Sequence, residues 1–293
     1  MGKDYILTGY STGKLVDDAE KIAELYREYG IVIFPDLLKQ DPTFLRYQAE
    51  LRTLMGRVIR RSSNVDLPSD IGDLLATLYK VKALDGRILA DLGTMPNKFF
   101  SFNQLKYAGW VDTILQAIYG PDAIMLTPHA GDTLHFFMPD KSMHRYNLPA
   151  HQDYQYLMQS PKQVTFYIGL SDYRDNVGHL RIWEKSHHLG ILKCTKNQYG
   201  SYEICDWDSL LAGYASADYT WNAGDFAIFD SLLAHASIPN TSGNAGRVVQ
   251  IYRYSDVNDP VAEANNYYST IYDRRGVLFS DAHADLYVPQ TTS

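Results

Sequence analysis

Apolar residues recur at helical spacing in the first part of the chain. One stripe runs from Leu15 to Tyr26 and stops at Gly30, which predicts a single helix ended by a glycine. The next helix is marked more clearly, because Asp41 is suited to cap its first turn and Pro42 to occupy its first helical position. The N-terminal pattern is therefore that of packed amphipathic helices.

Two further helical regions are predicted before the pattern changes. Ser69 is a candidate cap for a region whose apolar positions continue to Leu89. A fourth helix is expected around Trp110 and ends at Gly120, which a proline follows. We therefore expect residues 1–122 to form a mainly helical N-terminal part.

Beyond residue 122 the apolar period changes to two. In the run 163–170 every second residue is apolar, and such alternation is typical of a strand with one buried face. Turn-forming residues separate several runs of this kind. The strands predicted in the whole chain are 31–34, 133–138, 163–170, 225–229 and 247–254.

Helices followed by many short strands indicate an α+β protein whose β part is a sandwich or barrel. The sequence has no internal repeat and no linker-like stretch. We therefore predict one domain over residues 1–293, in which 123–256 form the β core and 257–293 a C-terminal extension.

Composition limits the possible partners. With 45% hydrophobic residues, a chain of 293 residues can bury a sizeable core. The net charge of −7 argues against nucleic acid or an anionic membrane as the main partner and favours a small-molecule substrate. Cys194 and Cys205 do not make a disulfide framework, and no apolar run approaches the ~20 residues that a bilayer requires. We expect a cytoplasmic protein, and nothing in the pattern points to a particular oligomeric state.

A His-x-Asp pair is the strongest chemical signal. In an extended segment His151 and Asp153 point to the same face, and an imidazole beside a carboxylate is two thirds of the ligand set of a non-haem ferrous ion. His235 follows another strand and a turn and is the candidate third ligand. The tripeptide also arises by chance, with the histidine bonded to its neighbour in a loop. Its place just before the clearest strand favours the metal site.

Arg247 adds a second kind of evidence. It begins a predicted strand in which Arg247, Val249, Ile251 and Arg253 share one face, and the two aliphatic neighbours suggest that this face is buried. A buried arginine needs an anionic partner, and a bound dicarboxylate supplies one. The alternative is a surface ion pair at a strand end.

Together these motifs resemble the phytanoyl-CoA dioxygenase family of Fe(II)- and 2-oxoglutarate-dependent oxygenases, over about residues 15–255. The resemblance implies a double-stranded β-helix, the cupin-like jelly roll, with flanking helices. One departure is the run Leu180 to Glu184, which puts the shape of an expected loop in doubt. The matching segments are Tyr29–Phe34, His151–Asp153, Gly178–Leu180, Lys185–Gly190, Ala223–Asp225, His235 with Ser237 and Asn240, and Arg247.

The resemblance also implies residue roles. His151, Asp153 and His235 become the catalytic metal ligands, and Arg247 the fork for the distal carboxylate of 2-oxoglutarate. A retained aspartate implies oxidation of the substrate, because related halogenases carry a small residue there. The further candidates are Gln152, Ser237, Thr165 and Tyr167 for the cosubstrate, and Arg145, Asn147, Tyr154, Tyr156 and Arg253 for the substrate.

The expected activity is hydroxylation of an unactivated C–H bond, with Fe(II), 2-oxoglutarate and O2 as cofactor and cosubstrates. The polar and aromatic candidates near the site favour a small polar metabolite, sugar-like or a biosynthetic intermediate. A protein of another class is also compatible with the fold, namely a cupin-like metal-dependent isomerase or a small-molecule binding protein without oxygenase activity.

Overall fold

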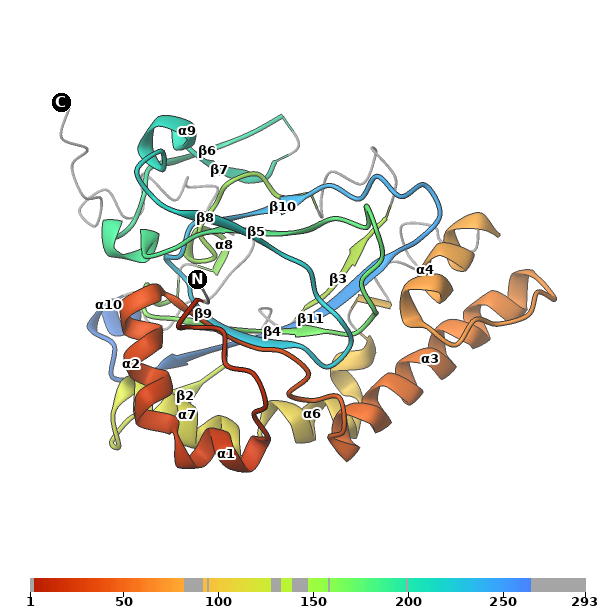
Figure 1. Cartoon of the computed structure of the whole chain (residues 1–293), viewed down its shortest axis with the longest axis horizontal. Helices are drawn as coiled ribbons and strands as arrows, with labels where there is room; N and C mark the ends of the chain where they lie inside the picture. Colours follow the sequence, from red (N-terminus) through yellow and green to blue (C-terminus); the bar gives the residue numbers. More distant parts are fainter. Residues whose placement is uncertain are drawn as a thin grey trace.

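Two antiparallel sheets face each other in the computed structural model (Figure 1). The model describes residues 3–81, 92–93, 95–127, 133–138, 147–157, 159–198 and 200–264. The strands are β1 (Ile31–Phe34), β2 (Met125–Leu126), β3 (Thr133–Phe137), β4 (Val164–Gly169), β5 (His179–Trp183), β6 (Cys194–Lys196), β7 (Tyr202–Ile204), β8 (Ser216–Tyr219), β9 (Phe226–Asp230), β10 (His235–Ile238) and β11 (Arg247–Asp256). The large sheet has the order β1-β9-β4-β11-β2, with β3 also paired to β11, and the small sheet has the order β10-β5-β8. Strands β6 and β7 form a separate hairpin.

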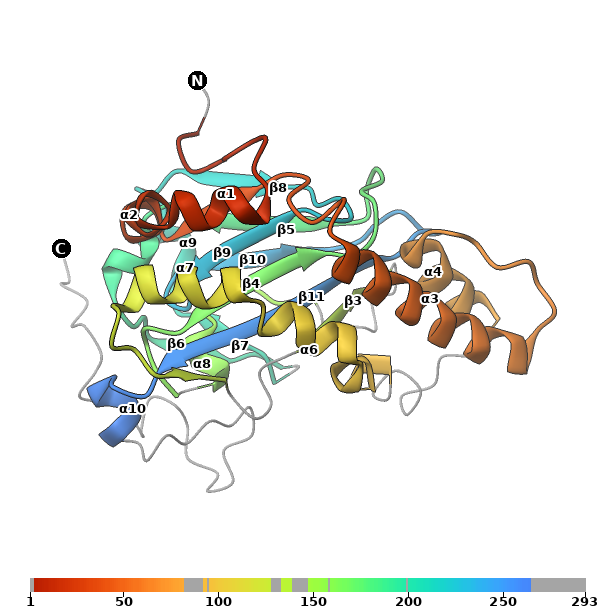
Figure 2. The same ribbon diagram turned by 90° about the horizontal axis from the view of Figure 1, so that it is seen from below.

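Helices cover the outer face of the large sheet, where α1, α7, α6 and α3 lie across its strands (Figure 2). The helices are α1 (Thr12–Asp17), α2 (Ala19–Tyr29), α3 (Pro42–Ser62), α4 (Ile71–Lys80), α6 (Phe100–Lys106), α7 (Gly109–Tyr119), α8 (Tyr154–Leu157), α9 (Trp207–Leu210) and α10 (Pro260–Ala264), with 3-10 turns η1 (Met95–Lys98) and η3 (Ser186–Leu189). Within the described ranges, no helix combines the length and apolarity needed to cross a bilayer.

Alternation along β4 separates two kinds of packing. Val164, Phe166 and Ile168 belong to the main apolar cluster, which joins the sheet to the helices. Tyr167 points the other way and packs with residues of both sheets, among them Ile182 of β5. Every residue of β4 is therefore buried, and its inner side chains line the space between the sheets. The alternation of apolar residues predicted that the outer face of β4 is buried. Its inner face is buried as well because the small sheet packs against it.

The predicted helices are mostly confirmed, with two corrections. Asp41 caps α3 as expected and accepts hydrogen bonds from two backbone N–H groups at 2.9 Å. The single helix predicted to run up to Gly30 is wrong, because the chain breaks at Asp18 into α1 and α2. The cap of α4 is Asp70 and not Ser69, since the Asp70 carboxylate accepts from the backbone of the first turn. The proposed continuation of that helical region to Leu89 lies outside the described residues, and α6 was not predicted.

Two predictions about the β part also need correction. The run that begins at Leu180 is no loop but most of strand β5, at the centre of the small sheet. His151 does not lie in a regular strand. It makes one antiparallel bridge to His235, and the chain then turns directly into α8. The two histidines are therefore brought together by a backbone contact that the local sequence does not specify.

A tight turn ties helix α2 to the small sheet. Nε2 of His187 lies 3.0 Å from the carbonyl oxygen of Arg27, and Nε2 of His188 lies 3.2 Å from that of Glu28. Both carbonyls belong to the last turn of α2, where a helix leaves its acceptors without intrahelical partners. Gly30 ends that helix with φ of 75°, and a Cβ there would overlap the His187 ring. The neighbouring Ser186 hydroxyl accepts from the backbone N–H of Ala234, immediately before His235. The histidine pair therefore anchors the end of α2, and the same turn also fixes the strand that carries a candidate ligand.

Candidate metal centre

Three side chains converge between the two sheets. His151, Asp153 and His235 are all buried, and one nitrogen or oxygen from each lies within 4.8 Å of the others. The Asp153 Oδ1 atom is 3.9 Å from Nε2 of His151 and 3.8 Å from Nε2 of His235. The backbone bridge holds the two imidazoles side by side, with ring centroids 4.2 Å apart. This is the two-histidine, one-carboxylate set that ferrous oxygenases use, with separations suited to one ion.

Backbone carbonyls fix the chemical state of both imidazoles. Nδ1 of His151 lies 2.7 Å from the Pro149 carbonyl oxygen, and Nδ1 of His235 lies 2.9 Å from that of Leu233. A carbonyl only accepts, so each Nδ1 carries the proton and each Nε2 keeps its lone pair for a metal. Burial, followed by the neighbouring histidine, lowers the pKa of His151 to about 3, and burial also lowers the pKa of His235. Both rings are therefore neutral at pH 7 and able to coordinate.

The carboxylate of Asp153 is held by two partners on neighbouring strands. Thr165 Oγ1 donates to Oδ2 over 2.7 Å. Arg253 donates from Nε to Oδ2 and from Nη2 to both oxygens, each over 3.1 Å. Burial on its own would raise the pKa of Asp153, but the Arg253 guanidinium holds it well below the usual range. Asp153 is therefore an anion at any working pH.

Arg247 is a buried cation without a counter-ion among the described residues. Only 1% of its surface is exposed, and its guanidinium lies 3.7 Å from the centroid of the Phe137 ring. Nη1 donates to the Tyr167 hydroxyl over 3.2 Å, whereas Nε and Nη2 have no hydrogen-bond partner in the described part of the chain. Two free donors on one edge of a fork match a carboxylate. The predicted burial of this strand face is confirmed.

Gln152 and Ser237 have tasks that the sequence did not indicate. The Gln152 amide donates to the carbonyls of Gly190 and Leu232 and accepts from the N–H of Leu192. The Gln152 side chain therefore links the loop around Gly190 and Leu192 to the loop around Leu232. Its contact with a cosubstrate stays a prediction. Ser237 lies two residues beyond His235 on β10, opposite Leu180 of β5, and its role also stays a prediction.

The residues predicted to contact substrate are dispersed. Tyr154 is fully buried in a small apolar cluster, and Tyr156 packs its ring edge-on to His151 while its hydroxyl bonds to the backbone of Tyr202. Asn147 is half-buried just before the metal-binding turn. Arg253 donates hydrogen bonds to Asp153, so its guanidinium is already engaged by the protein. Arg145 lies outside the described residues.

Sequence reasoning missed Phe137 and the two carbonyls that orient the histidines. Phe137 lies directly opposite Arg247 in the β3–β11 pairing, so only the strand register reveals it. The carbonyls of Pro149 and Leu233 each lie two residues before a ligand histidine. The offset is the same in both cases, but every residue has a carbonyl two positions before it, so nothing in the sequence singles out either contact.

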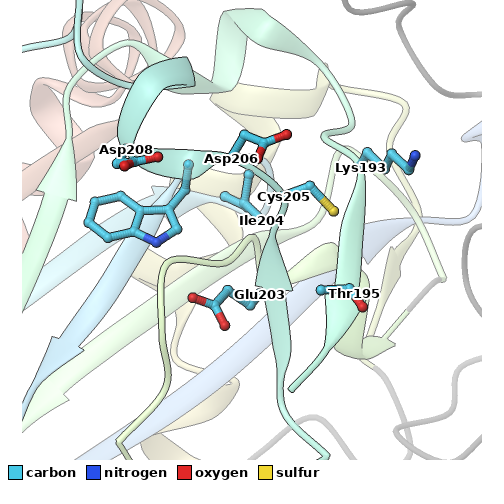
Figure 3. A pocket seen from close by; sticks show the side chains of 8 residues that line it. Lys193, Thr195, Glu203, Ile204, Cys205, Asp206 and Asp208 are labelled. Atoms are coloured by element: carbon cyan, nitrogen blue, oxygen red, sulfur yellow. The ribbon is translucent and has the colours of Figure 1, made fainter. Parts of the chain in front are cut away.

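A surface hollow lies between the β6–β7 hairpin and the start of α9 (Figure 3). None of its lining side chains belongs to the triad, and Cys205 and Lys193 come from neighbouring segments of the chain. Burial raises the pKa of the Cys205 thiol, so the group is not activated as a nucleophile. The hollow is lined by Lys193, Thr195, Glu203, Ile204, Cys205, Asp206, Trp207 and Asp208.

Solved structures share this architecture. The epimerase SnoN in complex with Fe³⁺, alpha ketoglutarate and nogalamycin RO is 15% identical, with a TM-score of 0.53 over 89% of this chain and 91% of that chain. EctD from S. alaskensis with 2-oxoglutarate and 5-hydroxyectoine is 12% identical, with a TM-score of 0.53 over 82% and 76%. The carbocyclase SnoK from nogalamycin biosynthesis is 15% identical, with a TM-score of 0.50 over 83% and 89%. At these identities the likeness shows the fold, and it confirms the predicted jelly roll.

Sequence comparison identifies the family. No curated protein matches the chain. The family model described as phytanoyl-CoA dioxygenase matches residues 26–249, which span both the first strand and most of the ligand-bearing β part. Because this match covers well over half of the sequence, the chain belongs to the phytanoyl-CoA dioxygenase family.

Proposed function

We propose that the protein is an Fe(II)- and 2-oxoglutarate-dependent dioxygenase that hydroxylates a small molecule. The observation that carries this proposal is Arg247, a buried guanidinium with two donors that no described residue satisfies. It shares the inner face of the large sheet with Thr165, whose hydroxyl holds Asp153. A dicarboxylate bound to the metal at one end needs such a fork at its other end. Family membership and the fold of the solved structures support the same activity.

The donor set fits a ferrous ion. His151 and His235 each offer a neutral Nε2, and Asp153 offers Oδ1. Three ligands from one side leave the remaining positions for the cosubstrate and O2. When bound, iron supplies the dioxygen chemistry that couples oxidation of the substrate to conversion of 2-oxoglutarate into succinate and CO2.

The protein's own residues supply orientation and a dry site. The carbonyls of Pro149 and Leu233 keep the imidazoles in the coordinating tautomer, because each accepts the Nδ1 proton. Arg247 is itself positioned by Tyr167 and by the Phe137 ring. Its free donors then orient the far carboxylate of the cosubstrate without a large rearrangement of the protein.

Hydroxylation is the finer part of the proposal. The solved structures include an epimerase and a carbocyclase, so one fold serves several outcomes. Asp153 would fill, on a bound iron, the position that a halide would need, which favours transfer of oxygen over halogenation. For the substrate we propose a small metabolite and place polar, sugar-like compounds first in a screen. Asn147 supports this choice, because it is half-buried and lies four residues before His151. Tyr156 and Arg253 instead form hydrogen bonds to the protein itself.

The test measures succinate and labelled oxygen together. Purified protein with Fe(II), ascorbate and 2-oxoglutarate is incubated under ¹⁸O2 with each compound of a metabolite panel. We expect one compound to raise succinate release above the substrate-free rate and to gain one ¹⁸O atom. If succinate is released but the product contains no ¹⁸O, the enzyme oxidises its substrate without hydroxylating it. Release that is absent, or equal in His235→Ala, would contradict the oxygenase and favour the isomerase or binding protein.

A further inference from the structure

The side chain of Arg253 lies against the metal-binding carboxylate and has no assigned role in the reaction. It stands on β11, six residues beyond Arg247 and on the same face. Its direct partner across the sheet is Thr165 of β4, and both side chains donate to Asp153. The Arg253 and Asp153 side chains are 8% and 5% exposed, so solvent does not screen the pair.

The contacts treat the two oxygens of Asp153 differently. Oδ2 accepts from the Thr165 hydroxyl and from Nε and Nη2 of Arg253. Among the described residues, Oδ1 accepts only from Nη2, and it faces Nε2 of both histidines. A carboxylate oxygen has about two lone pairs. Those of Oδ2 are fully used, whereas Oδ1 keeps one for a metal.

We infer that Arg253 and Thr165 are positioning residues that make Asp153 a one-oxygen metal ligand. They hold Oδ2 away from the ion, so the position that a second oxygen would take stays open for cosubstrate or O2. The inference rests on the proposed iron site, but it does not depend on turnover of any substrate. Thr165 was predicted to bind the cosubstrate and Arg253 the substrate. The geometry points to a different task for both.

A second consequence follows from the charges. The Arg253 cation and the Asp153 anion neutralise each other in a buried place. If Asp153 is shortened to glycine, the guanidinium and the Thr165 hydroxyl remain and face the vacated space. The removed group is CH2–COO⁻, and formate is a small ion that carries the same carboxylate, so the same donors can bind it. Rescue by formate therefore reports on Arg253 and not on general stability.

The probe for the test is Co(II), whose binding is followed anaerobically by its visible absorption. We expect Arg253→Met to weaken Co(II) affinity by about 10- to 100-fold, the usual effect of losing a group that orients a metal ligand. Arg253→Lys restores part of the loss, because an ammonium cannot make the forked contact. Thr165→Val gives a smaller loss. The matched control is Arg181→Met, which breaks a forked Arg–Asp pair with side chains 39% exposed and leaves Co(II) affinity unchanged.

The second arm uses Asp153→Gly. This variant loses Co(II) binding, and formate restores it. In the double variant Asp153→Gly with Arg253→Met, formate gives at most about a tenth of that recovery, in line with the effect of losing an orienting group. Equal recovery in the two backgrounds would overturn the inference, and so would wild-type Co(II) affinity in a folded Arg253→Met protein. If that variant does not fold, the Lys and Val variants and the formate arm decide.

These outcomes are separate from those of the proposed function. If the Co(II) affinities change as expected but the protein never releases succinate, the positioning role is supported and the proposed oxygenase activity is contradicted. If the protein releases succinate but the Arg253 variants keep the wild-type Co(II) affinity, the oxygenase activity is supported and the positioning role is contradicted.

Discussion

Replacing Arg247 with methionine is expected to stabilise the ligand-free protein while removing its response to 2-oxoglutarate. In the structure Arg247 is 1% exposed, and its guanidinium makes one hydrogen bond, to Tyr167, and leaves two donors without partners among the described residues. Among the described residues, the Tyr167 hydroxyl and the Phe137 ring offset only part of the desolvation of this cation. Methionine has a similar length and packs well against an aromatic ring such as Phe137.

The magnitudes can be worked from these contacts. Replacing buried ionic groups with apolar side chains of similar size raises the free energy of unfolding by about 1–4 kcal/mol in favourable cases. For a chain of this size each 1 kcal/mol moves Tm by roughly 2 °C, so the ligand-free variant should melt about 2–8 °C higher. Ligand at 100 times its Kd stabilises the wild type by about 2.7 kcal/mol, or roughly 5 °C.

The same change weakens cosubstrate binding. Loss of a hydrogen-bonded charge pair costs about 2–5 kcal/mol, which raises Kd at least about 30-fold. The ligand that stood at 100 times Kd then stands at about 3 times Kd or less, and it stabilises the variant by under about 1 kcal/mol. The difference in Tm between the two proteins should therefore shrink when 2-oxoglutarate is added, because the wild type gains about 2.7 kcal/mol from the ligand and the variant gains under about 1 kcal/mol.

Thermal melts under anaerobic conditions, with Mn(II) in place of Fe(II) and with or without 2-oxoglutarate, test this reasoning. Arg247→Lys separates charge from shape, since it should keep the cation and recover only part of the ligand response. A methionine variant that is less stable than the wild type without ligand would refute the claim of an unpaired cation. An unchanged response to 2-oxoglutarate would move the cosubstrate fork elsewhere.

Three other changes have defined outcomes. Alanine at His151, Asp153 or His235 should abolish succinate release while circular dichroism still shows a folded protein, and near-normal activity in any one of them would remove that residue from the ligand set. Products formed in high chloride should carry oxygen and no chlorine by mass spectrometry, because Asp153 fills the halide position; a chlorinated product from the wild type would contradict this. Burial raises the pKa of Asp230 from 3.8 to about 6, so its contribution to stability is complete below pH 3.8 and is lost as pH rises to 6, by about 3 kcal/mol. Asp230→Asn should flatten that part of the stability curve in urea unfolding at pH 4 to 8, and an unchanged curve would refute the assignment.

Local pattern was enough to find the residues that form the candidate metal centre. The period-two alternation in β11 placed Arg247 on a buried face, and the His-x-Asp pair with a distant histidine predicted the triad that the structure brings together. These signals survive because strand alternation is a property of the chain itself.

What the sequence could not show depends on register and turns. The assignment of Arg253 to Asp153 requires that β11 pair with β4 so that Arg253 lies opposite Thr165. It also requires that the chain turn into α8 directly after Asp153, whereas the His-x-Asp pattern predicts an extended segment. At the break between α1 and α2, the Asp18 carboxylate accepts from the Tyr10 hydroxyl, a contact that helical spacing does not reveal. Such contacts between distant or loop residues override local periodicity.

The most direct test of the metal centre is an anaerobic optical titration of the purified protein with Fe(II) and 2-oxoglutarate. Chelation of Fe(II) by the 2-oxo acid group produces a visible charge-transfer absorption that neither component gives alone. The geometry of His151, Asp153 and His235 predicts that this absorption appears in the wild type with one equivalent of iron, and that it is absent in His235→Ala. No absorption in the wild type, or equal absorption in the variant, would contradict the central claim that these three residues hold the iron to which 2-oxoglutarate binds.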